Sequence, residues 1–301
     1  MPSSSPRGSL GGAALVFGSC VSLSIGAAFA TQIFPALGAW GVTALRLSIA
    51  AVVMMLLVRP ALSRWTRAQW KAALLFGIAL GGMNGAFYAA IDRIPLGAAV
   101  AIEFLGPLVL SAALTRRLID TAWLGLAVAG IALLGVDGMI GADPLDPIGV
   151  GFALIAAAFW AFYIRATARA GAVIPGRGGL AVAFVVASVL LLPFGVPAAL
   201  TAAADPMLVL FAALTALLAS IIPYTLELAA LRRLPQRVFG ILLSLEPATA
   251  TVAGWLLLGQ AASGLRLTAV AFVIAASIGV SLAARRAPAE PETRITQPAT
   301  P

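Results

Sequence analysis

The 301-residue sequence has no histidine, a single cysteine and few charged residues. The absence of histidine removes the commonest metal ligand and the usual base of a hydrolytic triad. One cysteine, Cys20, allows no disulfide within the chain, and its apolar surroundings suggest a packing residue. No CxxC pair, phosphate-binding glycine loop or GxSxG motif is present. These absences favour a protein that is not an enzyme, and they predict neither a metal nor a cofactor.

The sequence is rich in long apolar runs. Hydrophobic residues make up 61% of the chain and charged residues 10%, against about 45–50% and about 25% in soluble domains. A helix needs about 20 apolar residues to cross the hydrocarbon core of a bilayer. Continuous runs of about that length are found at 10–31, 41–58, 72–91, 96–114, 121–137, 148–167, 179–197, 207–230, 236–257 and 265–284. Apolar and polar residues do not alternate within these runs, as they would in the strands of a membrane β-barrel. We therefore predict an all-α polytopic membrane protein with ten transmembrane helices.

The first run contains Ala28-Phe29-Ala30, a small-residue pattern that also occurs at signal-peptide cleavage sites. The run is longer than a signal peptide requires, and only one basic residue, Arg7, precedes it. We therefore interpret it as a membrane span.

The basic residues predict how the chain is oriented. Sixteen of the nineteen Lys and Arg fall on one side of the predicted spans, Arg93 and Arg266 fall on the other, and Arg46 lies within a span. Since cytoplasmic loops carry the excess of basic residues, both termini are predicted to be cytoplasmic, as an N-terminal segment 1–9 and a disordered tail 286–301. The net charge of +8 then reflects topology and contact with the lipid bilayer, and does not indicate a nucleic-acid partner.

An offset of 140 residues indicates an internal repeat. It relates three pairs of residues in equivalent positions: Arg93 and Arg233, Pro95 and Pro235, and Pro107 and Pro247. We predict one five-span repeat over 10–140 and a second over 148–285. An odd number of spans inverts the second copy, and such inverted 5-helix repeats are a recurring plan of secondary transporters that bind substrate near the midplane. A duplicated scaffold without a transport role is the alternative.

Four charged residues fall within predicted spans: Arg46, Glu103, Glu227 and Glu246. A charge at the centre of a bilayer costs roughly 2.5–3.5 kcal/mol, so such residues usually face a cavity or one another. We predict that the four form the substrate and proton sites, with Glu246 as the proton carrier because it lies nearest the midplane. The structural alternatives are an interfacial ion pair between Glu227 and the nearby Arg232 or Arg233, and a fixed contact of Arg46 with a carboxylate or with helix carbonyls.

Prolines and aromatic residues accompany these charges. Pro107, Pro223 and Pro247 are expected to kink their helices and to free carbonyls one turn earlier, which protein, water or ligand must then satisfy. Polar and aromatic side chains at helical spacing near the acids predict the lining of a cavity: Asn84, Tyr88, Trp160, Tyr163 and Tyr224. Each of these could equally be a packing residue or part of an interfacial aromatic belt.

Several segments resemble a known family. They are GVTALRLSIA (41–50), LGGMN (80–84), IPLGAAVAIEFLGPL (94–108), IIPYTLELAALRRLP (221–235) and VFGILLSLEPATA (238–250). Together with ten spans in two halves, they resemble the EamA-type drug/metabolite transporter (DMT) superfamily, and within it the bacterial exporters of threonine and homoserine. The likeness extends over residues 10–285.

This resemblance implies a multi-pass protein of the bacterial inner membrane that exports small amino acids, with proton antiport as a hypothesis for its coupling. It implies a central cavity formed by spans one to four and six to nine, and it matches Arg46, Glu103, Glu227 and Glu246 to membrane-embedded charges of the family. Arg165 departs from the pattern, because we expect an uncharged residue there. Export of other metabolites or cationic drugs is the main alternative, and a passive channel or a membrane enzyme is less favoured. The substrate, the coupling ion and the oligomeric state are not fixed by the sequence.

Overall fold

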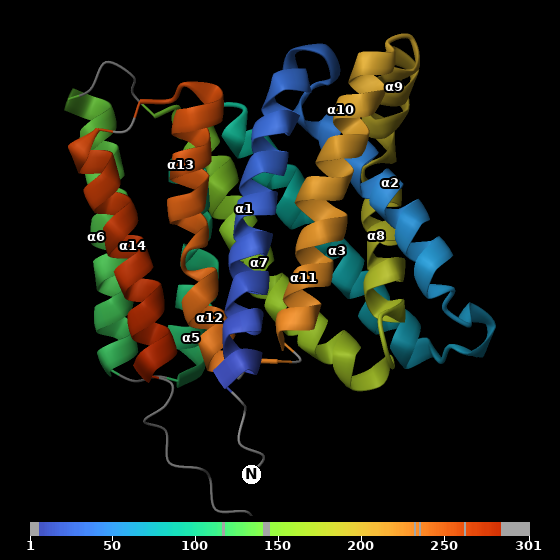
Figure 1. Cartoon of the computed structure of the whole chain (residues 1–301), viewed down its shortest axis with the longest axis horizontal. Helices are drawn as coiled ribbons and strands as arrows, with labels where there is room; N and C mark the ends of the chain where they lie inside the picture. Colours follow the sequence, from blue (N-terminus) through green and yellow to red (C-terminus); the bar gives the residue numbers. More distant parts are fainter. Residues whose placement is uncertain are drawn as a thin grey trace, which may run out of the picture.

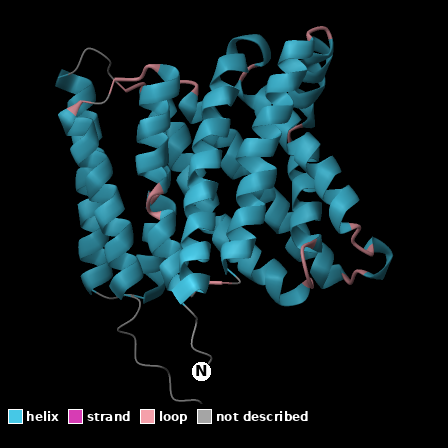
Figure 2. Cartoon of the chain, viewed as in Figure 1, coloured by secondary structure: helices cyan, strands magenta, loops and turns pink. Residues whose placement is uncertain are grey.

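The computed structural model describes residues 6–115, 118–140, 145–231, 233–234, 236–261 and 263–283. These residues form helices joined by short loops, and they contain no strand (Figures 1 and 2). Eight helical stretches of the described residues are long and apolar enough to cross a membrane, three of them made of consecutive helices, and the number is nine if one bent pair counts as a single span. The predicted all-α polytopic class is therefore confirmed, while the predicted tail 286–301 lies outside the described residues.

The helices follow one another with few intervening residues. The first half contains α1 (Pro6–Leu37), α2 (Ala39–Val58), η1 (Leu62–Arg64), α3 (Arg67–Ile91), α4 (Leu96–Glu103), α5 (Leu105–Thr115) and α6 (Leu118–Ile140). The second half contains α7 (Pro147–Val173), α8 (Gly178–Leu190), α9 (Leu192–Ala203), α10 (Pro206–Ala216), η2 (Leu217–Ile221), α11 (Ile222–Leu231), α12 (Gln236–Leu243), α13 (Glu246–Leu258) and α14 (Gly264–Ala283).

Helix starts follow from local chemistry. Thr66 and Gln69 form a reciprocal capping box at the start of α3, which satisfies amide groups that have no partner within the helix. The side chains of Asp146 and Asp205 accept hydrogen bonds from backbone amides at the starts of α7 and α10, and each is followed by proline. Proline is favoured at this first helical position because its missing amide would have no helical partner there.

Two of the predicted spans are interrupted near their middle. α4 ends at Glu103 and α5 begins two residues before Pro107, while α12 ends at Leu243 and α13 begins at Glu246, directly before Pro247. In a third span, the π-helical turn η2 lies directly N-terminal to α11, which contains Pro223. Since proline cannot donate the helical hydrogen bond, each irregularity lies within about one turn of the proline.

The span predicted over 179–197 differs from the structure. It consists of α8 and α9, which meet at Leu191 with a bend of 82°. Pro193 is the second residue of α9, so its missing amide removes the helical bond to the preceding turn. The run predicted over 121–137 forms part of α6, but its apolar portion Thr121–Asp137 is shorter than the other spans.

The helices form one bundle in which α6 and α14 pack against each other at one side (Figure 1). In the rest of the bundle, α3 packs on α7 and α8, while α1 packs on α11 and α13. The start of α1 and the end of α14 lie at the same end of the bundle (Figure 1). Many large apolar side chains face outward, among them Leu57, Leu200 and Leu256, which are 71%, 73% and 65% exposed. Lipid contact accounts for such a surface.

The first helix continues through the segment that resembles a cleavage site. Ala28 and Ala30 are fully buried within α1, and Gly26 lies directly against Leu218 and Ala219 of η2. This packing favours the interpretation of the first run as a span.

The offset of 140 residues recurs in the helix bounds. α4 and α12 are separated by 140 residues at both of their ends, as are the last residues of α3 and α11, Ile91 and Leu231. The contacts correspond as well, because α3 packs on α7 as α11 packs on α1.

Candidate functional site

Arg46 lies near the middle of α2 and is 1% exposed. Its guanidinium donates hydrogen bonds to the carbonyl of Ala219 at 2.7 Å, to the hydroxyl of Ser220 at 2.9 Å and to the amide oxygen of Asn84. It also lies over the ring of Tyr88, 4.5 Å from the centroid, in a favourable cation–π arrangement. Arg46 is therefore held by neutral groups, and no described carboxylate forms an ion pair with it.

The Ala219 carbonyl that accepts from Arg46 belongs to an irregular part of its helix. Pro223 supplies no amide hydrogen, so carbonyls about one turn earlier need other partners. The carbonyl of Leu218 accepts a bond from the Ser22 hydroxyl at 2.7 Å, and that of Ala219 accepts from Arg46. The proline thus leaves the Ala219 carbonyl without a helical partner, and this carbonyl is one of the acceptors that orient Arg46.

The three acids in the spans are linked electrostatically. Glu246 acts on Glu103, and Glu227 acts on Glu246, and we call the three in this order the row of acids. Glu103 and Glu246 are only 7% and 8% exposed, and they flank the interruptions of their respective spans. Neither forms an ion pair with a residue that the structure describes. Like charges repel strongly in a medium of low dielectric constant, so three ionised carboxylates would destabilise one another here.

Glu227 lies at one end of this row. Its carboxylate accepts a hydrogen bond of 2.8 Å from the hydroxyl of Ser19 in α1. Of the two arginines considered as its interfacial partners, Arg232 lies outside the described residues and Arg233 is exposed without an ion pair to Glu227.

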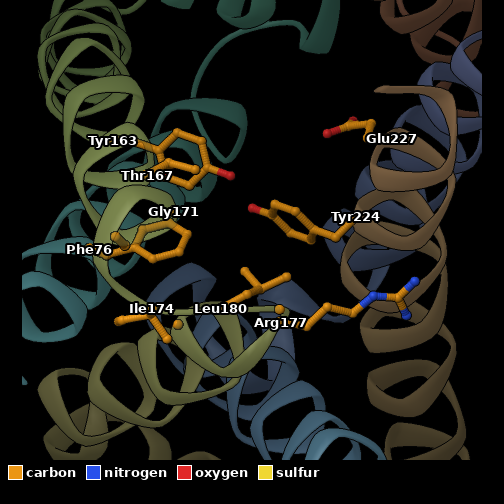
Figure 3. A pocket seen from close by; sticks show the side chains of 12 residues that line it. Phe76, Tyr163, Thr167, Gly171, Ile174, Arg177, Leu180, Tyr224 and Glu227 are labelled. Atoms are coloured by element: carbon orange, nitrogen blue, oxygen red, sulfur yellow. The ribbon is translucent and has the colours of Figure 1, made fainter. Parts of the chain in front are cut away.

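A cavity of about 220 Å³ opens between α3, α7, α8 and α11. Glu227 and Tyr224 line one wall, and Tyr163 and Phe76 line another, with the hydroxyl groups of the two tyrosines pointing toward one another (Figure 3). Tyr224 lies four residues after Ser220, which accepts a hydrogen bond from Arg46. The cavity therefore includes one of the buried acids, Glu227, and a residue one turn from a partner of Arg46.

The predicted lining residues fall into two groups. Tyr163 and Tyr224 line the cavity, while Asn84 and Tyr88 are buried around Arg46. Trp160 packs edge-on against Phe104, at 4.8 Å between centroids, and does not line the cavity.

Several residues at this site were not predicted from the sequence. Ser19, Ser22 and Gly26 share one face of α1 and contact the second half, and their spacing of three and four residues is a signal that could have identified them. Thr167 and Arg177 line the cavity as well. Thr167 lies in α7 one turn after Tyr163, a spacing that could have identified it, whereas Arg177, directly before α8, carries no comparable pattern.

Known proteins resemble this chain over most of its length. The EamA-like transporter family matches residues 147–282. The threonine/homoserine exporter RhtA of Salmonella typhimurium strain SL1344 is 40% identical over 270 residues, which cover 89% of this chain and 90% of the exporter. RhtA of Escherichia coli K12 is 39% identical over 268 residues, covering 88% of this chain and 89% of the exporter.

One solved crystal structure shares the fold, with a TM-score of 0.54 at 22% identity, over 93% of this chain and 98% of the solved chain. With about 40% identity over nine tenths of its length to such exporters, the chain belongs to the EamA-type drug/metabolite transporter superfamily.

Proposed function

We propose that this protein is a secondary transporter that exports small amino acids, of the threonine and homoserine kind, across the bacterial inner membrane. The observation that carries the proposal is the presence of buried charges of both signs that do not pair with each other. Arg46 has no acidic partner and Glu103 and Glu246 have no basic one among the described residues. An amino-acid zwitterion supplies both counter-charges, a carboxylate for Arg46 and an ammonium for the acids.

The dimensions of the cavity favour a small substrate. Sites for drug-sized ligands usually have volumes of about 300–1,000 Å³, whereas this cavity has about 220 Å³. This supports amino-acid export over the export of cationic drugs, as does the 40% identity to the Salmonella exporter.

We further propose ten spans arranged as two inverted repeats, 10–140 and 148–285, with both termini cytoplasmic. The matching bounds of α4 and α12 support the repeat, and so does the family match, which covers 147–282. Sixteen of nineteen basic residues on one side support the orientation. In such a plan, transport proceeds as one half rocks against the other around a central site.

Proton coupling follows from the row of acids. Three carboxyl groups that interact without a basic partner are neutralised by protons when no ammonium group is bound. We assign the proton to Glu246, which interacts electrostatically with both other acids, and substrate contact to Glu103 and Glu227.

Efflux of labelled threonine and homoserine from proteoliposomes tests this proposal, with and without an imposed pH gradient. We expect saturable transport, counterflow, and accumulation that depends on the gradient. Glu246→Gln should abolish gradient-driven accumulation but retain counterflow. Glu103→Gln removes a carboxylate that we assign to substrate contact, so it should raise KM and keep the dependence on the gradient. Flux that does not saturate would indicate a channel, and a preference for cationic drugs would indicate the alternative substrates. If Glu246→Gln accumulates substrate along the gradient as well as the wild type does, the assignment of the proton to Glu246 is refuted.

A further inference from the structure

We propose that the cavity between α7 and α11 is a recruitment site for the substrate, in which Arg177 binds the carboxylate, Glu227 the ammonium and Thr167 the side-chain hydroxyl of a hydroxylated amino acid. The inference rests on the proposed function, and adds a first binding position that shares Glu227 with the row of acids and extends to Arg177.

The two charged residues of this cavity are not paired with each other. Arg177 and Glu227 both line it, yet no ion pair joins them, and the Arg177 side chain makes no hydrogen bond to a described residue. Tyr224 lies along the wall between them (Figure 3). A zwitterion carries one charge of each sign, so a single amino acid offers a partner to both groups.

A hydroxyl group without a partner adds the third contact. The Thr167 hydroxyl is buried and makes no hydrogen bond within the described residues, although it lies near the hydroxyl of Tyr163. Buried polar atoms usually have a partner, so such an exception needs an explanation. A hydroxyl on the substrate side chain would satisfy it, and threonine and homoserine both carry one.

The loop that carries Arg177 holds it at the rim of the cavity. Gly176 adopts a positive φ of 71°, a conformation that favours glycine, and α8 begins two residues later. Gly178 lies against Trp65 and Pro60, and Gly179 against Ile174, so the backbone around Arg177 is packed while its side chain stays exposed. The rim lies at the end of the bundle where α1 begins (Figure 1), which is the proposed cytoplasmic side.

The test measures the KM for labelled threonine entering inside-out vesicles, where the proposed cytoplasmic face is exposed. Arg177→Gln should raise KM about tenfold, the effect of losing one charge-assisted hydrogen bond, with little change in the maximal rate. Arg177→Lys should recover part of the loss. Arg169→Gln is the matched control, because Arg169 is an exposed arginine of the same region that does not line the cavity.

Substrate analogues then separate the three contacts. Threonine amide lacks the carboxylate charge, so Arg177→Gln should leave its affinity unchanged. Thr167→Val removes the protein hydroxyl, and valine lacks the hydroxyl of threonine. The variant should therefore reduce the preference for threonine over valine several-fold. Wild-type transport with an unchanged KM in Arg177→Gln overturns this inference and leaves the proposed function intact. Failure of the wild-type protein to transport any amino acid overturns both.

Discussion

The hydroxyl groups of Ser48 in α2 and Ser188 in α8 lie 2.6 Å apart and share a hydrogen bond. The two residues are separated by 140 positions, the offset that also relates Pro107 to Pro247. Equivalent residues of two repeats can touch only close to the axis that relates the repeats. If the inward- and outward-facing states exchange the conformations of the two halves, a contact on this axis is retained in both states.

Cysteines at positions 48 and 188, in a background where Cys20 is replaced by alanine, should therefore form a disulfide without stopping transport. Each single cysteine serves as a control, because it cannot cross-link within the chain. The measurement is threonine efflux before and after oxidation, with the extent of cross-linking determined by mass spectrometry. An oxidised protein that is inactive and recovers with reductant would place this contact away from the axis.

A second prediction concerns Asp146, which caps α7 and forms an exposed ion pair of 2.8 Å with Arg93. Asp146→Asn keeps an acceptor for the amide of Ile148, whereas Asp146→Ala loses it. We expect faster amide hydrogen exchange in the first turn of α7 for the alanine variant only. Exchange that is equally faster than the wild type in both variants would show that the ion pair, and not the cap, stabilises this turn.

The pH dependence of this contact follows from its charges. The hydrogen bond from Arg93, followed by that from the Ile148 amide, holds the pKa of Asp146 below its usual range. Because the pKa is lower in the folded protein, the stabilisation is present above the unfolded value of about 3.9 and is lost as the pH falls through the folded value. Exchange at the start of α7 should therefore show no Asp146-dependent change between pH 5 and pH 8.

A third prediction concerns the buried pair that joins α6 to α14. Arg266 lies 3.0 Å from the Asp137 carboxylate, and Ser263 donates a hydrogen bond to the same carboxylate. Asp137→Ala leaves a buried cation without a partner, which typically costs about 3–5 kcal/mol. The apparent melting temperature in detergent should fall, and the double variant Asp137→Leu with Arg266→Met should recover most of the loss. A double variant with a melting temperature as low as that of the single variant would mean that the unpaired Arg266 charge does not cause the loss of stability.

Local chemistry in the sequence accounts for much of the fold. The apolar runs depend only on residue type, and the interruptions beside Pro107 and Pro247 occur where a missing amide must break the helical pattern. The bend at Leu191 has a similar local cause in Pro193, but the surrounding apolar run conceals it. Hydropathy measures composition along the chain, and a bend of 82° leaves it unchanged.

The partners of the buried charges could not be predicted in the same way. Arg46 binds Ala219 and Ser220, which are 173 and 174 residues away, and Glu227 binds Ser19 across 208 residues. These contacts depend on how α1 and α2 pack against the second half. The sequence therefore identifies the charged residues, while only the assembled bundle shows that Arg46 is held by neutral groups and not by a carboxylate.

That neutral environment leads to the last prediction. Asn84 accepts a hydrogen bond from Arg46, and Asn84→Asp would replace the amide oxygen with a carboxylate of nearly the same shape. The new carboxylate would pair with Arg46 and repel the carboxylate of a substrate. We expect KM for threonine in proteoliposomes to rise about tenfold or more, with thermal stability equal to or above that of the wild type, because the buried guanidinium gains a counter-charge. Asn84→Ala, which removes the contact without adding charge, should lower stability and raise KM less. A stable Asn84→Asp protein with an unchanged KM would mean that Arg46 supports the helices and does not bind the substrate carboxylate.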